Sequence, residues 1–158
     1  MVKYIKGNIL NVTEGIIVQQ VNCKGVMGAG LAKQIKDKWP NIYSDYKEKL
    51  SLTTCNKDLL GKIRWTKADS KSTDYLYVAS IFGQYDYGRD KRYTIYPALF
   101  KGLESVFEIA YPDKMPIYIP KGLGCGLAGG NWDFVEAYIQ DLDLFFDKKI
   151  EIIIVEKE

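Results

Sequence analysis

Hydrophobic and polar residues follow two periodicities along this chain, and their order predicts an α/β protein. Apolar runs typical of strands cover residues 2–6, 16–22, 61–67, 75–80, 117–119 and 150–155. Apolar residues at helical spacing predict helices over residues 29–38, 40–50, 94–110 and 131–146. The order β-β-α-α-β-β-α-β-α-β predicts a three-layer α/β/α sandwich with a mixed central sheet, formed by one domain over residues 1–158.

Residues that favour helix ends lie at the borders of these segments. Trp39 precedes Pro40, so the first helix is expected to end there and the second to carry the proline in its first turn. Thr94 is expected to cap the third helix, and Pro97 to lie in its first turn. Asn131 is expected to cap the fourth helix.

A glycine-rich turn separates the second strand from the first helix. Gly25, Gly28 and Gly30 lie there, between an apolar run and a series of good helix formers. Such a turn presents backbone N–H groups at the positive end of a helix dipole, which favours an anion such as a phosphate. Tight packing alone also explains glycines at a strand-to-helix turn. The spacing matches neither the dinucleotide fingerprint nor the P-loop.

A second glycine-rich segment, residues 120–130, follows the strand at 117–119 and precedes the last helix. In a sheet of the predicted kind, both glycine loops leave the ends of adjacent central strands and line one crevice. Two anion-binding loops on one crevice suit a diphosphate better than a single phosphate.

Residues 81–92 combine aromatic side chains, two glycines and two of the three arginines of the chain. Aromatic faces and guanidinium groups on a loop are suited to a nucleotide or a phosphate. A surface loop anchored by Phe82 is an equally good interpretation.

Composition narrows the functional classes. The 158 residues carry a net charge of +2, which gives no strong signal for nucleic acid or for an anionic membrane. No apolar run has the length of a membrane span, and Lys3 and Lys6 interrupt the beginning of the chain before a signal-peptide core forms. We therefore expect a cytoplasmic protein without membrane contact.

The chain contains no histidine, and its three cysteines lack the spacing of metal ligands. The missing histidine excludes Ser-His-Asp and Cys-His nucleophiles and histidine-ligated zinc. We expect no metal and no cofactor. Chemistry must come from carboxylates, amides, backbone groups, lysine or the substrate.

Three motifs together resemble the macro domain family, which binds ADP-ribose and its relatives. They are Lys6-Gly7-Asn8-Ile9, the segment from Val21 to Gly30, and the segment from Gly124 to Trp132. The resemblance covers essentially the whole chain. It is strongest to the branch that contains ADP-ribose-1''-phosphate phosphatase-like proteins and terminal ADP-ribose glycohydrolases.

The resemblance implies that ADP-ribose or a derivative binds in a cleft between the two glycine-rich loops. Asn8 and Ile9 match the adenine edge, although many members carry aspartate at the position of Asn8, so the usual carboxylate bond to the adenine amine is in doubt. An amide oxygen can accept that bond without the gain that a charge gives. The expected ligand-binding residues are Asn8, Ile9, Asn22, Met27, Gly28, Ala29, Gly30, Phe82, Leu123, Gly124, Cys125, Gly126, Leu127, Ala128 and Gly129.

The resemblance defines the ligand more closely than it defines the reaction. Glycohydrolase members use a lysine and an aspartate, but this chain has Gln84 and Ala128 at or near those positions, which disfavours a covalent lysine adduct. The first hypothesis is an ADP-ribose-1''-phosphate phosphatase in which Asn22 orients the distal ribose and Gln84 or Asp90 positions water. The alternatives are removal of ADP-ribose from a modified macromolecule and binding without turnover.

Overall fold

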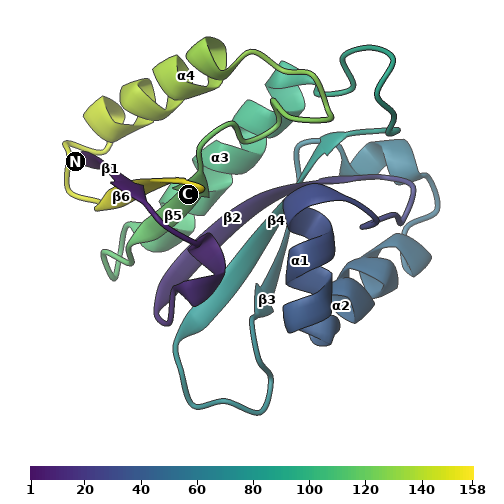
Figure 1. Ribbon diagram of the computed structural model, residues 1–158, viewed down its shortest axis with the longest axis horizontal. Coiled ribbons are helices and arrows are strands. Elements are labelled where there is room, and N and C mark those ends of the chain that lie inside the picture. The colour runs from purple at the N-terminus through teal and green to yellow at the C-terminus, as the bar shows by residue number, and fades with distance from the viewer.

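A six-stranded sheet forms the middle layer of the structure, a computed structural model that describes residues 1–158 (Figure 1). Its strands are β1 (Val2–Lys6), β2 (Gly15–Asn22), β3 (Ile63–Lys67), β4 (Leu76–Gln84), β5 (Ile117–Pro120) and β6 (Ile152–Glu156). The order across the sheet is β1-β6-β5-β2-β4-β3, and every pair is parallel except β3 with β4. The predicted mixed sheet is therefore confirmed.

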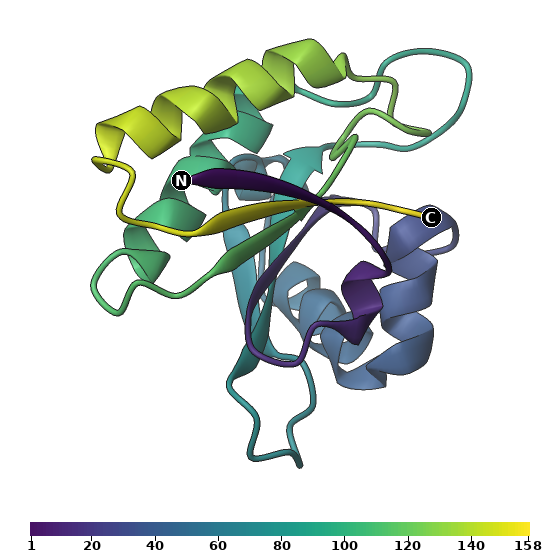
Figure 2. The same ribbon diagram turned by 60° about the vertical axis from the view of Figure 1, so that its left-hand side comes forward.

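Helices cover both faces of this sheet, as Figures 1 and 2 show from two directions. One face carries α3 (Tyr96–Ala110) and α4 (Trp132–Phe145), and the other carries α1 (Gly30–Lys38) and α2 (Pro40–Ser51). Two short 3-10 turns, Ile9–Asn11 and Asn56–Leu59, complete the regular structure. The three-layer α/β/α arrangement agrees with the prediction.

The central strand β2 explains how two separate cores form. Ile16 and Val18 pack with the helices α3 and α4, whereas Ile17 and Val21 face α1 and α2. Successive side chains of a strand point to opposite faces, so a strand covered on both sides is apolar at nearly every position. Complete burial of such a side chain contributes about 1.5–3 kcal/mol.

Two predicted boundaries are wrong for reasons of tertiary contact. Strand β4 does not end at residue 80 but continues to Gln84, because its last residues pair with β2 and place Phe82 in the core. Thr94 does not cap α3, since Ile95 occupies the position before the helix. The Thr94 hydroxyl instead donates to the carbonyl of Gly124, 2.6 Å away.

The capping role of Asn131 is confirmed, because its side chain accepts a hydrogen bond from the backbone N–H of Asp133. Both glycine-rich segments leave the carboxyl ends of neighbouring strands, one after β2 and the other after β5. That order brings together two segments about a hundred residues apart in the sequence. None of the helices has the length and apolarity needed to cross a membrane.

Candidate functional site

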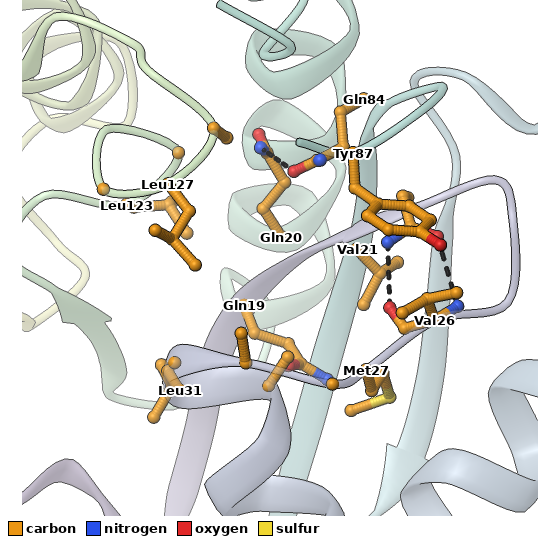
Figure 3. A pocket seen from close by; sticks show the side chains of 18 of the residues that line it. Gln19, Gln20, Val21, Val26, Met27, Leu31, Gln84, Tyr87, Leu123 and Leu127 are labelled. Carbon is orange, nitrogen blue, oxygen red and sulfur yellow. Dashed lines mark hydrogen bonds between the residues drawn. The ribbon is translucent and has the colours of Figure 1, made fainter. Parts of the chain in front are cut away.

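A cavity of about 590 Å³ lies across the carboxyl ends of β5, β2 and β4 (Figure 3). A volume of this order suits a ligand of nucleotide size. In Figure 3, Leu123 and Leu127 lie at the left of the cavity, Leu31 and Met27 lie at the bottom, and Gln20 and Gln84 contact each other at the upper centre. The walls therefore come from both glycine-rich segments, and polar side chains of β2 and β4 lie between the walls.

The first wall is a row of backbone donors. The N–H groups of residues 28–32 have no hydrogen-bond acceptor within the protein. They belong to the glycine turn and the first residues of α1, where the helix dipole is positive. Gly30 has a φ of 59°, a conformation that glycine adopts without the strain other residues incur. This wall is thus an uncapped helix start facing the cavity.

Hydrogen bonds of the Asn22 side chain stabilise the conformation of this turn. Its Nδ2 donates to the carbonyl of Val26 at 2.8 Å, while Oδ1 accepts from the backbone N–H groups of Lys24 at 3.0 Å and Val26 at 3.3 Å. The buried Tyr46 hydroxyl accepts from the N–H of Gly25 and lies within hydrogen-bond distance of Asn22. The side-chain amide of Asn22 therefore makes most of its hydrogen bonds to groups of the protein itself.

The second wall offers a matching set of donors. The backbone N–H groups of Gly126, Leu127 and Ala128 have no acceptor within the protein. The turn before them depends on Gly124, whose φ is 72°. A Cβ at Gly124 would lie 3.0 Å from Gln20 Oε1 and 3.2 Å from Thr94 Oγ1, so a larger residue would disturb the floor of the cavity.

A network of amides and a hydroxyl joins the two walls. Gln20 Nε2 donates to Gln84 Oε1 at 2.7 Å and to Thr94 Oγ1 at 2.9 Å. Gln84 Nε2 donates to the carbonyl of Asp86, so both ends of this side chain are held. Because Thr94 in turn donates to Gly124, β2, β4 and the second glycine loop are connected through side chains.

The ionisable groups of the cavity are few. Tyr87, Arg89 and Lys121 line it, and no carboxylate does. Lys121 has a partner in Glu156 at 3.4 Å, whereas Arg89 belongs to none of the ion pairs. The cavity therefore favours anionic ligands, and none of its lining residues is a carboxylate that could act as a general base.

The cysteines near the glycine loops are not activated nucleophiles. Burial raises the pKa of the Cys23 thiol to about 11, against a small opposing effect of Lys24, and burial likewise raises the pKa of Cys125 to about 11. Both thiols remain protonated at neutral pH, although the thiolate is the reactive form. No group of three or more potential metal ligands occurs in the structure.

The structure brings most of the residues expected to bind the ligand around this cavity. The lining residues among those predicted are Asn22, Met27, Gly28, Ala29, Gly30, Gln84, Leu123, Gly124, Gly126, Leu127 and Ala128.

Six further predicted residues do not line the cavity. Asn8 accepts a hydrogen bond from the N–H of Leu10, and Ile9 and Phe82 belong to the core beneath α1 and α2. Asp90 is exposed, and its carboxylate accepts from the Tyr93 hydroxyl at 2.6 Å. Cys125 and Gly129 lie in the second glycine segment without lining the cavity.

The sequence pattern predicts no role for the lining residues Gln19, Gln20 and Lys121, whereas Tyr87 and Arg89 lie in segment 81–92, where aromatic rings and guanidinium groups were expected to suit a nucleotide. The sequence contains one signal for Gln19 and Gln20. Two consecutive glutamines interrupt an otherwise apolar strand, and polar residues buried in a central strand need partners. Gln19 donates to Ser80 at 2.9 Å, while its Oε1 has no partner.

No protein-family model matches the sequence. An uncharacterized 17.5 kDa protein of Enterobacteria phage T4 is 30% identical over 162 residues, which cover all of this chain and 97% of that protein. DNA ADP-ribosyl glycohydrolases of Mycobacterium bovis and Mycobacterium tuberculosis are 38% identical over 48 residues. That match covers 30% of this chain and only 14% of the length of those relatives.

Solved structures with the same fold include proteins named as macrodomains. A protein of unknown function from Bacteroides thetaiotaomicron superposes with a TM-score of 0.83 at 25% identity, covering 99% of this chain and 98% of that one. The macrodomain of Mycobacterium tuberculosis DarG gives 0.81 at 20% identity, with coverage of 98% and 97%. Thermosipho africanus DarTG, solved in complex with ADP-ribose, gives 0.75 at 21% identity, with coverage of 98% and 41%.

Proposed function

Because the chain belongs to the macrodomain family, we propose that its cavity binds ADP-ribose or a derivative of ADP-ribose. The observation that carries this proposal is the pair of facing donor rows, residues 28–32 and residues 126–128, whose N–H groups lack acceptors in the protein. A diphosphate is the ligand group that can use both rows at once. Hydrogen bonds from N–H groups to a charged oxygen are about twice as strong as bonds between neutral groups.

We infer the direction of the ligand from the family resemblance and from the positions of the loops. The resemblance places adenine at the end of the cavity nearest β1, although Asn8 and Ile9 themselves do not line the cavity. The distal ribose then lies at the opposite end of the cavity, beside Gln84, Tyr87 and Arg89. A group attached to the distal ribose would leave the cavity past these residues.

Hydrolysis of ADP-ribose 1''-phosphate is the reaction that this end of the cavity fits best. Of the two cationic residues that line the cavity, Lys121 is paired with Glu156 and Arg89 has no carboxylate partner. A guanidinium binds phosphate through two parallel hydrogen bonds. Water would attack the phosphorus atom, the bond between phosphorus and the ribose oxygen would break, and a proton would pass to that oxygen. The products would be ADP-ribose and inorganic phosphate.

The side chains of this chain would act by orientation and charge. Gln84 would position the water, Asn22 would keep the first glycine turn open to the distal ribose, and the free N–H groups would stabilise charge on the phosphoryl oxygens. Asp90 adjoins Arg89 in the chain, but its carboxylate is occupied by the Tyr93 hydroxyl. Without a histidine or a carboxylate in the cavity, we expect slow turnover.

A phosphorus NMR time course with excess ADP-ribose 1''-phosphate tests this proposal. Loss of the monoester signal with release of inorganic phosphate is the expected result, and Arg89→Gln should slow it by about tenfold or more. Arg92→Gln is the matched control, since Arg92 lies on the same loop but stacks on Tyr96 outside the cavity. A stable monoester in the presence of folded protein contradicts the phosphatase reaction.

Release of ADP-ribose from a modified macromolecule is the second candidate. The local similarity to DNA ADP-ribosyl glycohydrolases supports it, although Gln84 and Ala128 provide no lysine or aspartate for that chemistry. Chromatography of an ADP-ribosylated oligonucleotide after incubation would detect free ADP-ribose. If both substrates persist while calorimetry shows ADP-ribose binding, the protein is a binding module without turnover.

A further inference from the structure

Helix α4 carries apolar side chains on two faces, and only one of these faces packs against the rest of the protein. Val135 and Ile139 belong to the core that α4 shares with α3 and the sheet. Phe134, Leu144 and Phe145 are instead 58%, 61% and 77% exposed. Figures 1 and 2 show α4 at the outer surface of the molecule, with no other segment beyond it. The second apolar face is therefore open to a partner.

The exposed side chains form one row along the helix. Phe134, Ala137, Asp141 and Leu144 follow one another at intervals of three, four and three residues, which keeps them on one side of a helix. Phe145 adjoins Leu144 on the same side, and all five residues are exposed. We call these five residues the outer stripe. Isolated apolar residues are common on protein surfaces, but this spacing is the one by which a helix packs against another helix.

Aromatic rings beside the outer stripe widen the apolar surface. The Tyr96 ring meets Phe134 edge to face at 5.7 Å between centroids, and the Phe100 ring stacks on Tyr138 at 4.3 Å. Tyr96, Phe100 and Tyr138 are themselves partly exposed. Contiguous apolar surface marks sites of interaction between proteins, and aromatic residues are enriched at such sites.

The charges at the two ends of α4 have opposite signs. Asp133 lies in the first turn, and Lys148 and Lys149 follow the last turn. All three are exposed and belong to none of the ion pairs. A second α4 that runs antiparallel would place its lysines beside Asp133, whereas a parallel one would place like charges together. The helix is therefore complementary to a second copy of itself in the antiparallel direction.

We propose that the outer stripes of two copies of this chain pack against each other, antiparallel, in a symmetric dimer. Antiparallel packing brings Phe134 of one copy beside Leu144 and Phe145 of the other, and a two-fold axis repeats this contact. Ala137 lies between these ends, where a small side chain lets the helices approach closely. Asp141 is the one charged residue of the outer stripe, and a polar residue within a helix contact fixes its register at a cost in stability.

A membrane surface and a helix of a different protein are the competing occupants. Helix α4 contains acidic side chains and no lysine or arginine, which disfavours a surface of anionic lipid. A different protein would have to supply both the apolar spacing and the reversed order of charges. A second copy supplies both from the same segment.

Sedimentation velocity of the full chain tests the inference. The contact is of modest size, because α4 has 14 residues, so the unaltered protein should change from monomer to dimer between about 1 μM and about 1 mM. Leu144→Asp should weaken the dimer at least about tenfold, since it places a charge in the apolar contact. Leu52→Asp is the matched control, because Leu52 is 73% exposed at the end of α2 and lies outside the outer stripe. A chain that stays monomeric, or an equal effect of the two variants, overturns the inference.

Reversal of single charges tests the antiparallel direction. Asp133→Lys alone and Lys148→Glu alone each place like charges at both ends of the pair, and each should weaken the dimer by about tenfold. An equimolar mixture of the two variants restores opposite charges at both ends and should associate as the unaltered protein does. Circular dichroism checks that each variant is folded. A mixture that associates no better than its components overturns the proposed pairing, and ADP-ribose binding remains a separate question because no residue of the outer stripe lines the cavity.

Discussion

The hydroxyl of Tyr46 lies 2.6 Å from the backbone oxygen of Asn22 and 3.0 Å from its Oδ1. Tyr46 belongs to α2 and is completely buried, and its hydroxyl also accepts from the N–H of Gly25 at 3.0 Å. Burial raises the pKa of Tyr46 above its usual range, so the hydroxyl stays protonated at all ordinary pH values. The buried Tyr46 of α2 thus stabilises the first glycine turn through hydrogen bonds.

We expect Tyr46→Phe to destabilise the protein and weaken ADP-ribose binding. Removing the hydroxyl leaves the N–H of Gly25 without its partner and takes a donor from the backbone carbonyl of Asn22, and an unpaired buried polar group costs about 1–3 kcal/mol. Denaturant unfolding and calorimetry measure the two effects. Tyr43→Phe is the control, because the Tyr43 hydroxyl makes one longer bond of 3.3 Å to the carbonyl of Gly25. Equal stability of the two variants would contradict the assigned role of Tyr46.

Gly124→Ala should be destabilising, whereas Gly126→Ala should leave stability nearly unchanged. Gly124 combines a φ of 72° with close neighbours, since a Cβ would lie 3.0 Å from Gln20 Oε1 and 3.1 Å from Leu99 Cδ2. The left-handed conformation alone costs other residues about 1–2 kcal/mol. A Cβ at Gly126 meets no atom within 4 Å. Thermal unfolding of both variants checks this, and a smaller loss for Gly124→Ala than for Gly126→Ala would refute it.

The contribution of Asp45 to stability should depend on pH. Burial by itself raises the pKa of this carboxyl, but hydrogen bonds from Arg64 and Thr66 outweigh burial and hold the pKa below its ordinary value. The pKa is thus lower in the folded state than in the unfolded state. The stabilisation is then complete above the unfolded-state value of about 3.9 and is lost as the pH falls through the folded-state value.

Asp45→Asn tests this dependence. The difference in unfolding free energy between this variant and the unaltered protein should be largest near neutral pH and should shrink below about pH 4. Urea titrations at several pH values provide the measurement. Asp69→Asn serves as the control, because Asp69 is exposed and has no cationic partner among the ion pairs. A difference for Asp45→Asn that is constant with pH would count against the ion pair as its cause.

Alkylation should distinguish the three cysteines. At pH 8, iodoacetamide should modify the exposed Cys55 first, while Cys23 and Cys125 react slowly because burial raises the pKa of each thiol to about 11. Mass spectrometry of peptides gives the order of modification. Protein alkylated at Cys55 alone should bind ADP-ribose normally. Rapid modification of Cys125 with loss of binding would show that its thiol is more accessible and more important than the structure indicates.

Local patterns in the sequence determined the order of the elements and the α/β/α class. Apolar periodicity distinguishes strands such as Ile16–Val21 from helices such as that following Asn131, and these patterns depend on near neighbours in the chain. The meeting of the two glycine segments also followed from sequence, because parallel strands with helical crossovers bring their carboxyl ends to one edge.

Tertiary structure alone decided which side chains complete the cavity. The sequence predicts Thr94 as a helix cap, yet its hydroxyl donates to the carbonyl of Gly124, thirty residues further along the chain. The sequence pattern predicts no role for Gln20, although its side chain joins Gln84 of β4 to Thr94 and lies close to Gly124. Hydrogen bonds of this kind depend on side-chain direction and on distances between strands that are not adjacent in sequence. Periodicity records which face of a strand is apolar, but it does not record which distant partner satisfies a buried polar atom.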